Sequence, residues 1–148
     1  MSLYEDIEKD LKNSLKAKDE IRISTLRMVR SAIKYKEVEQ RKKLEDDEIL
    51  KVLSSLVKQH KDSIEEYRKG GREDLVERET RELEILQSFM PAQLTEEELT
   101  PAVARIIAEL GASSMKDMGR VMKMAMERFT GRADGKRINE IVKKLLSA

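Results

Sequence analysis

The chain has 148 residues, of which 40% are charged and 3% aromatic, and its formal net charge at pH 7 is +1. This length suits one domain or two small ones, and the lack of Cys excludes disulfides, thiolate nucleophiles and Cys-ligated metals. So few aromatic side chains argue against a base-stacking platform for single-stranded nucleic acid. High charge with 6 Gly and 2 Pro favours long amphipathic helices over sheet.

Neither a membrane span nor a signal peptide is expected. No apolar run approaches the roughly 18 residues that a membrane-spanning helix needs. The segment Leu3 to Leu15 is amphipathic rather than continuously apolar, unlike the apolar region of a signal peptide. We therefore expect a cytoplasmic protein with no membrane partner.

Residues 1–92 are predicted to form an N-terminal domain of long helices folded on one another. Apolar residues recur there at intervals of three and four, which is the spacing of one helix face. Polar or Gly-containing stretches separate the runs. The predicted helices are about 3–18 behind a Ser2–Glu5 capping box, one from an Asp19 cap to about Lys43, one from Asp46 or Asp47 to Gly70, and one that carries Leu75 to Phe89 and stops at Pro91.

Residues 93–148 are predicted to form a smaller C-terminal domain of three helices. The first follows a capping box of Thr95 and Glu98 and closes at Gly111. Pro101 either kinks this helix near Thr100 or stands at the first position of a helix that begins there. The second helix begins at Ser114, and Asp134 caps the third.

Methionines and one glycine mark the second of these helices. Met118 and Met122 lie on the expected core stripe with Val121, whereas Met124 and Met126 lie off it. Gly119 costs about 1 kcal/mol relative to Ala inside a helix. The usual compensation is the close approach of another helix or of a ligand.

The search for catalytic residues, metal ligands and cofactor motifs predicts none of them. His60 is the one histidine, and it shares an apolar helix face with Leu56 and Ile64, which is typical of a packed side chain. There is no pair of His residues on one helix and no Asp-rich calcium loop. The acidic clusters 46–48 and 96–98 lie at predicted helix starts, where carboxylates complement the helix dipole.

Positive charge gathers toward the C-terminus. Residues 115–148 hold 9 Lys and Arg against 4 Asp and Glu, whereas residues 45–114 hold 9 against 17. The run Gly131 to Gly135 (GRADG) joins two predicted helices, and Gly135 lies in a first turn, where free backbone N–H groups attract anions. A solvated interhelical turn with ordinary surface charges explains the same residues equally well. The predicted phosphate-contacting residues are Arg128, Arg132, Gly135, Lys136, Arg137, Lys143 and Lys144, with Arg27, Arg30 and Lys34 as N-terminal contributors.

Two helices around a Gly-containing turn are superficially similar to a helix-turn-helix. The turn is long, however, and the second helix offers few side chains that read bases. DNA is therefore not an expected partner.

Segments spread over nearly the whole chain resemble the YqeY family, which is similar to the C-terminal tail domain of GatB, a subunit of the tRNA-dependent amidotransferase. Two positions depart from the family pattern: His60 stands where the family usually has Arg, and Pro101 lies within a helix that the family continues. The segments that carry the resemblance are LRMVRSAIK (26–34), KQHKDSIEEYRKGGREDL (58–75), FMPAQLTEEEL (89–99), GASSMKDMGRVM (111–122) and GRADG (131–135).

The resemblance implies an all-α protein with an elongated N-terminal helical part and a small C-terminal three-helix bundle. It further implies a stand-alone module that binds tRNA or assists tRNA-dependent amidation or aminoacylation. One alternative is a protein-interaction module that docks on an aminoacyl-tRNA synthetase or an amidotransferase. Another is a carbon–nitrogen ligase with glutamine as amido donor, although the sequence has no Cys and no Ser/Lys amidase centre to perform that chemistry.

Overall fold

The structure is a computed structural model that describes residues 2–147. These residues form helices and no strand, which confirms the prediction of an all-α protein. The chain divides into two compact units, Met1–Met90 (unit 1) and Pro91–Ala148 (unit 2), and each is described by itself. Among the described residues no helix is both long and apolar enough to cross a membrane.

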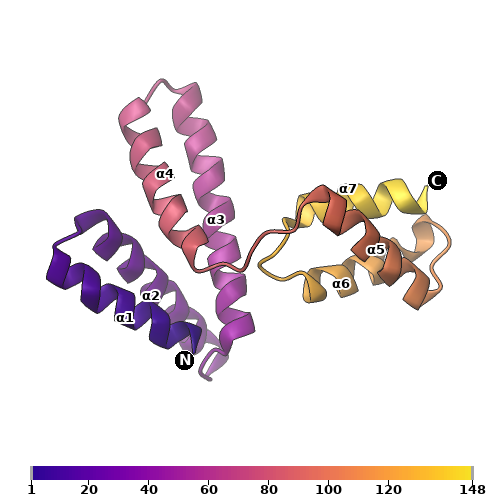
Figure 1. Cartoon of the computed structure of the whole chain (residues 1–148), viewed down its shortest axis with the longest axis horizontal. Coiled ribbons are helices and arrows are strands. Elements are labelled where there is room, and N and C mark those ends of the chain that lie inside the picture. The colour runs from indigo at the N-terminus through magenta and orange to yellow at the C-terminus, as the bar shows by residue number, and fades with distance from the viewer. Residues whose placement is uncertain (1, 148) are drawn as a thin grey trace. The chain divides into compact units, whose positions relative to one another are not determined.

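Unit 1 consists of two antiparallel helical hairpins whose apolar faces meet in one core. Helices α1 (Leu3–Ala17) and α2 (Glu20–Gln40) form the first hairpin, and α3 (Asp46–Lys69) and α4 (Glu73–Ser88) form the second (Figure 1). The buried side chains of this core are aliphatic, and the partly buried Tyr4 and Phe89 pack against them. The buried members of the core are Ile7, Leu11, Leu26, Val29, Ile33, Leu44, Ile49, Val52, Leu53, Leu56 and Leu86.

The helix starts of unit 1 follow the sequence signals closely. Ser2 and Glu5 form the predicted capping box: the Ser2 Oγ accepts from the Glu5 N–H at 3.1 Å, and the Glu5 carboxylate accepts from the Ser2 N–H at 3.3 Å. Asp19 caps α2 through the Arg22 N–H. The end of α2 was predicted about three residues too late, because Arg41 takes a left-handed conformation (φ 57°) that terminates the helix after Gln40.

Unit 2 is a bundle of three α-helices joined by short connecting segments. These are α5 (Glu96–Leu110), α6 (Met118–Arg128) and α7 (Gly135–Leu146), and a single 3₁₀ turn, η1 (Met115–Asp117), leads into α6. Their apolar faces enclose a second core. Its buried members are Leu94, Leu99, Val103, Ile106, Val121, Ala125, Phe129, Ile138, Ile141, Val142 and Leu146.

Pro101 lies inside a continuous α5, so the alternative in which the helix begins at Thr100 is wrong. The Thr95–Glu98 capping box forms as predicted, and Leu99 is fully buried in the core. These contacts hold the first turn in helical conformation although Pro101 has no N–H to donate.

Gly119 has no close neighbour in the described residues, so the expected close approach of another helix is wrong. A Cβ atom built on Gly119 meets no heavy atom within 4 Å, and its φ is not in the left-handed region. Gly111 also has open space around it, but its φ of 63° is left-handed and closes α5. The two glycines therefore differ in backbone conformation rather than in packing.

We predict that the same substitution has opposite effects at these two positions. Gly119→Ala should stabilise unit 2 by about 0.5 kcal/mol because it restricts the unfolded chain. Gly111→Ala should destabilise it by about 1 kcal/mol because Ala is strained at positive φ. Urea unfolding followed by amide NMR signals of α6 measures both; equal effects at the two sites would contradict the assignment.

A bidentate ion pair joins α1 to α2. The Arg22 guanidinium donates from Nε to the Asp10 Oδ1 at 2.7 Å and from Nη2 to the Asp10 Oδ2, and the two side chains are 32% and 23% exposed. The hydrogen bonds from Arg22 hold the pKa of Asp10 below its ordinary value, with a smaller contribution from Ser14. Folding therefore weakens proton binding at Asp10.

We predict that Asp10→Asn lowers the stability of unit 1 by about 1 kcal/mol at neutral pH, a value for a partly exposed pair. Because the folded-state pKa is the lower one, this contribution is complete above the ordinary carboxyl pKa and disappears as the pH falls through the lowered one. Urea unfolding followed by tyrosine fluorescence at a series of acidic pH values measures it. Asp62→Asn, at an exposed position of α3, is the control; a difference between the two variants that does not change with pH would count against the pair.

Candidate functional site

The turn between α6 and α7 is built by one glycine and one aspartate. Gly131 adopts a left-handed φ of 75°, which reverses the chain after the buried Phe129. Asp134 is the N-cap of α7: its carboxylate accepts from the Lys136 N–H at 2.9 Å, and its carbonyl accepts from the Ile138 N–H at 3.1 Å. The sequence prediction of an Asp134 cap is confirmed.

Hydrogen bonds tie this turn to the segment that enters unit 2. The Leu94 N–H donates to the Arg132 carbonyl at 2.8 Å, and the Gln93 side chain donates to the Gly131 carbonyl at 2.7 Å. In return, the Arg132 Nε donates to the Ala92 carbonyl at 3.3 Å. The Arg137 Nη1 donates to the Leu94 carbonyl at 3.4 Å. Both arginines therefore stabilise the fold as well as carrying charge.

The N-terminus of α7 is a weaker anion site than its sequence indicates. The Asp134 carboxylate already uses one free N–H group and places a negative charge where a phosphate would bind. Met126 covers Gly135 from one side, since a Cβ there would come within 3.1 Å of the Met126 methyl carbon. A phosphate at this helix end would have to share it with both groups.

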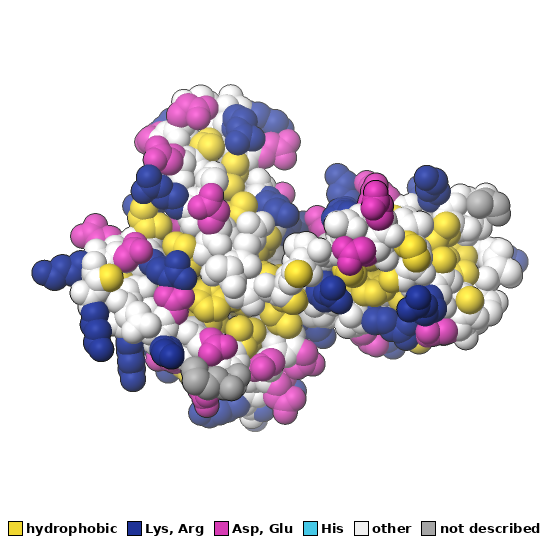
Figure 2. All heavy atoms as spheres, in the orientation of Figure 1, with side chains coloured by type: hydrophobic (Ala, Val, Ile, Leu, Met, Phe, Trp, Pro, Cys, Tyr) yellow, Lys and Arg dark blue, Asp and Glu magenta, His cyan; other side chains and the backbone are white. Residues whose placement is uncertain are grey.

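The exposed lysines of α7 carry the most available positive charge of the predicted surface. Lys136, Lys143 and Lys144 are exposed, and within residues 2–147 no ion pair engages them. Glu140 lies between them on the helix, so the charge is not uniform. Figure 2 likewise shows Lys and Arg interspersed with acidic and hydrophobic side chains on the visible face of unit 2.

Arg128, one of the predicted phosphate-contacting residues, is paired with Glu109. Its guanidinium forms a bidentate pair with Glu109 at 3.0 and 3.3 Å, which links α6 to α5. This hydrogen bonding raises the pKa of Arg128 and lowers that of Glu109. Arg128 therefore contributes less charge to a phosphate surface than the lysines of α7.

The N-terminal contributors lie on α2 in unit 1. Arg27 and Lys34 are exposed and two helical turns apart, so they share one face. Arg30 is half-buried and lies 3.8 Å from the Glu8 carboxylate. Arg27 and Lys34 make no ion pair with any residue from 2 to 147.

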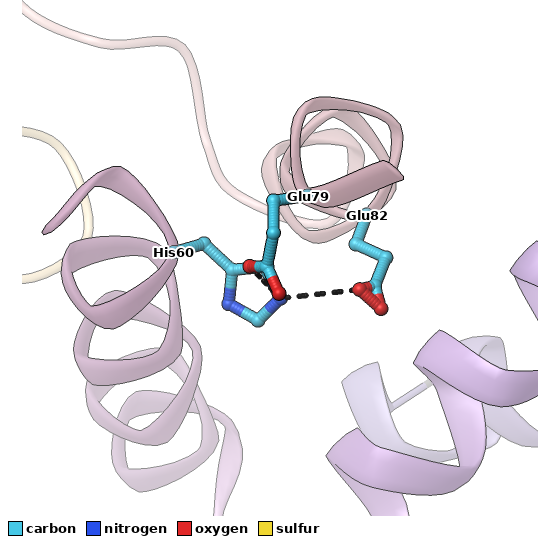
Figure 3. A group of neighbouring side chains, drawn as sticks. All are labelled: His60, Glu79 and Glu82. Carbon is cyan, nitrogen blue, oxygen red and sulfur yellow. Dashed lines mark ion pairs between the residues drawn. The ribbon is translucent and has the colours of Figure 1, made fainter. Parts of the chain in front are cut away.

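A cluster that no sequence motif predicts lies between α3 and α4. His60, on α3, points toward Glu79 and Glu82 on α4 (Figure 3). The His60 Nε2 lies 3.4 Å from the Glu79 Oε2 and 3.7 Å from the Glu82 Oε2. The His60 Nδ1 lies 2.9 Å from the Leu56 carbonyl oxygen. The expectation that His60 is packed is confirmed, since the residue is 7% exposed.

Comparison with known proteins decides the family. The family model described as Yqey-like protein matches residues 4–146, nearly the whole chain. The chain belongs to the YqeY family. This confirms the resemblance seen in the five sequence segments.

Curated relatives of this YqeY-family chain include the proteins named "Altered inheritance of mitochondria protein 41, mitochondrial" of three yeasts. The Lachancea thermotolerans protein is 41% identical over 74% of this chain and 60% of its own length. The Kluyveromyces lactis protein is 40% identical over 72% and 60%, and the Vanderwaltozyma polyspora protein is 33% identical over 76% and 64%. The chain thus spans about three fifths of the length of these relatives.

The names of these relatives overturn the expectation of a cytoplasmic protein. All three carry the word mitochondrial. The expectation relied on composition and on the amphipathic first helix. Neither feature distinguishes a mitochondrial protein from a cytoplasmic one.

One signal in the sequence does point to the cluster that was missed. In an antiparallel helical hairpin, residues about equally far from the turn lie opposite each other. His60 precedes the Gly70–Gly71 turn by about as much as Glu79 and Glu82 follow it. The two glutamates are three residues apart and so share one helix face.

We predict that Asp134→Ser strengthens polyanion binding without unfolding α7. Ser caps a helix about as well as Asp, so stability should change by less than about 0.5 kcal/mol. Removing the carboxylate should raise affinity about two- to fivefold, the range that one charge at a helix end provides. The salt concentration at which the protein elutes from heparin measures this affinity. Asp62→Asn, which removes one negative charge elsewhere, is the control. Elution of both variants at the same salt concentration would show that the N-terminus of α7 does not contact the polyanion.

Proposed function

We propose that this YqeY-family protein is an accessory module that holds tRNA by its phosphate backbone, through the exposed lysines of α7. The observation that carries the proposal is that Lys136, Lys143 and Lys144 are exposed on one short helix without ion-pair partners in the described residues. When lysines neutralise phosphates, the counterions bound to the nucleic acid are released, and this release drives non-specific binding. The choice of tRNA rests on the resemblance to the GatB tail domain.

The side chains available in unit 2 favour contacts to the backbone over contacts to bases. Phe129 is the one aromatic residue of 91–148 and is 6% exposed, so unit 2 offers no exposed aromatic side chain on which a base can stack. Arg132 and Arg137 are held by carbonyl groups of their own fold. Selection among tRNAs would therefore come from shape or from a partner protein.

A second candidate function is docking on a tRNA-handling enzyme, a synthetase or an amidotransferase, through unit 1. Tyr35 and Val38 on α2 are large apolar side chains that are 74% and 78% exposed. Tyr35 also borders a groove of about 670 Å³ between α2 and α3. Exposed aromatic residues beside a groove are typical anchors of protein interfaces.

We predict that Lys136→Glu with Lys143→Glu weakens tRNA binding and lowers its salt dependence. Neither lysine makes a side-chain hydrogen bond or ion pair in the described residues, so the fold should not change. Losing two phosphate contacts should reduce the slope of log K against log salt concentration by about 1.5 to 2. Filter binding or fluorescence anisotropy over a salt series measures both quantities.

The matched control is Lys12→Glu with Lys16→Glu, two exposed positions of α1 that change the net charge equally. A general charge effect would weaken binding alike in both double variants and would contradict a surface on α7. If wild-type protein binds tRNA no better than a neutral helical protein at low salt, the tRNA proposal fails. A partner protein that then remains bound after nuclease treatment would favour docking.

A further inference from the structure

The hydrogen bond at Nδ1 determines which form of His60 faces the two glutamates. The Leu56 carbonyl can only accept, so the His60 Nδ1, 2.9 Å away, must carry the hydrogen and donate it. In the neutral ring this leaves the lone pair on Nε2. The His60 side chain is 9% exposed, so its Nε2 is aimed into the protein rather than into solvent.

Three electron-pair donors therefore converge on one point. The Nε2 lone pair faces the Glu79 Oε2 at 3.4 Å and the Glu82 Oε2 at 3.7 Å, and these carboxylates are 22% and 12% exposed. Both distances exceed the usual 2.7–3.2 Å of an N–H···O hydrogen bond. Two carboxylates and a lone pair repel one another, so a cation placed between them would be stabilised by all three groups.

We propose that His60, Glu79 and Glu82 form a binding site for a divalent transition metal of the Zn²⁺ type. Ligands about 2.0–2.1 Å from a tetrahedral zinc lie about 3.3–3.5 Å apart, close to the 3.4 and 3.7 Å between the His60 Nε2 and the two carboxylate oxygens. The three donor atoms all lie within 4.8 Å of one another. The Leu56 carbonyl orients the ring in the way that metal-bound histidines are commonly oriented.

The donor set selects the class of metal. One imidazole nitrogen with two carboxylate oxygens suits Zn²⁺ and its neighbours in the first transition row, whereas Mg²⁺ prefers oxygen ligands alone. Three protein ligands leave a fourth position for water, and the 22% exposure of Glu79 gives water access to the cluster. Because His60 belongs to α3 and both glutamates to α4, the metal would clamp this hairpin together.

The competing explanation is a proton in place of the metal, which turns His60 into an imidazolium paired with both carboxylates. Both explanations place a positive charge between the carboxylates, so a measurement of metal binding is needed to distinguish them. His60→Arg is the decisive variant, because a guanidinium can bridge two carboxylates but cannot bind a metal. It should keep the hairpin folded while abolishing the site.

The test is titration of the metal-free full-length protein with ZnCl₂ and, separately, with MgCl₂, at near-neutral pH against a chromophoric competitor. The wild type should bind one Zn²⁺ per chain and show an intense tetrahedral visible spectrum with Co²⁺. His60→Arg should lose this binding, and Glu82→Gln should weaken it by more than about tenfold. Glu84→Gln, an exposed position of α4, should leave it unchanged.

The thermal midpoint of the wild type should also rise with Zn²⁺ and not with Mg²⁺, by mass action, while that of His60→Arg should not respond to either. Wild-type protein without stoichiometric Zn²⁺ binding would overturn the proposal in favour of the imidazolium pair. Equal Zn²⁺ binding by the wild type and His60→Arg would place the metal elsewhere and overturn it as well.

Discussion

The structure depends on the burial of aliphatic helix faces. No disulfide is possible, and the largest fully buried side chains of unit 1 are all aliphatic, with Tyr4 and Phe89 only partly buried against them. They include Ile7, Leu26, Ile33, Leu53 and Leu86. Each such side chain contributes about 1.5–3 kcal/mol on burial. Charged residues lie on the outer faces, where ion pairs such as Asp10–Arg22 link neighbouring helices.

In unit 2, contacts that stabilise the fold also reduce the capacity of the basic turn to bind an anion. Asp134 begins α7 well because its carboxylate satisfies a free N–H group, and for that reason it competes with any phosphate at the same helix end. Arg132 and Arg137 anchor the segment 92–94. The positive charge that remains available to a polyanion therefore lies on the exposed lysines of α7. These lysines face solvent because the apolar side of α7 is buried in the core.

Local signals predicted most helix starts, because a cap is a contact between residues two or three positions apart. Ser2, Asp19, Thr95 and Asp134 all cap the expected helices. Helix ends and glycine environments were harder to predict. The left-handed Arg41 and the open surroundings of Gly119 follow from how the chain continues and packs, which the neighbouring residues do not encode. For the same reason, the engagement of Arg128 by Glu109 across 19 residues was not foreseen.

By itself the sequence determined that this protein is all-α, that it belongs to the YqeY family and where its basic residues lie along the chain. Helical periodicity and short motifs can be read from residues close together in the sequence, and composition needs no structure at all. Only the tertiary structure decided which charges are already paired and that His60 meets two glutamates. Those outcomes depend on the register of α3 against α4, and that register follows from the packing of whole helix faces. A lone histidine in the sequence thereby becomes one member of a three-residue cluster.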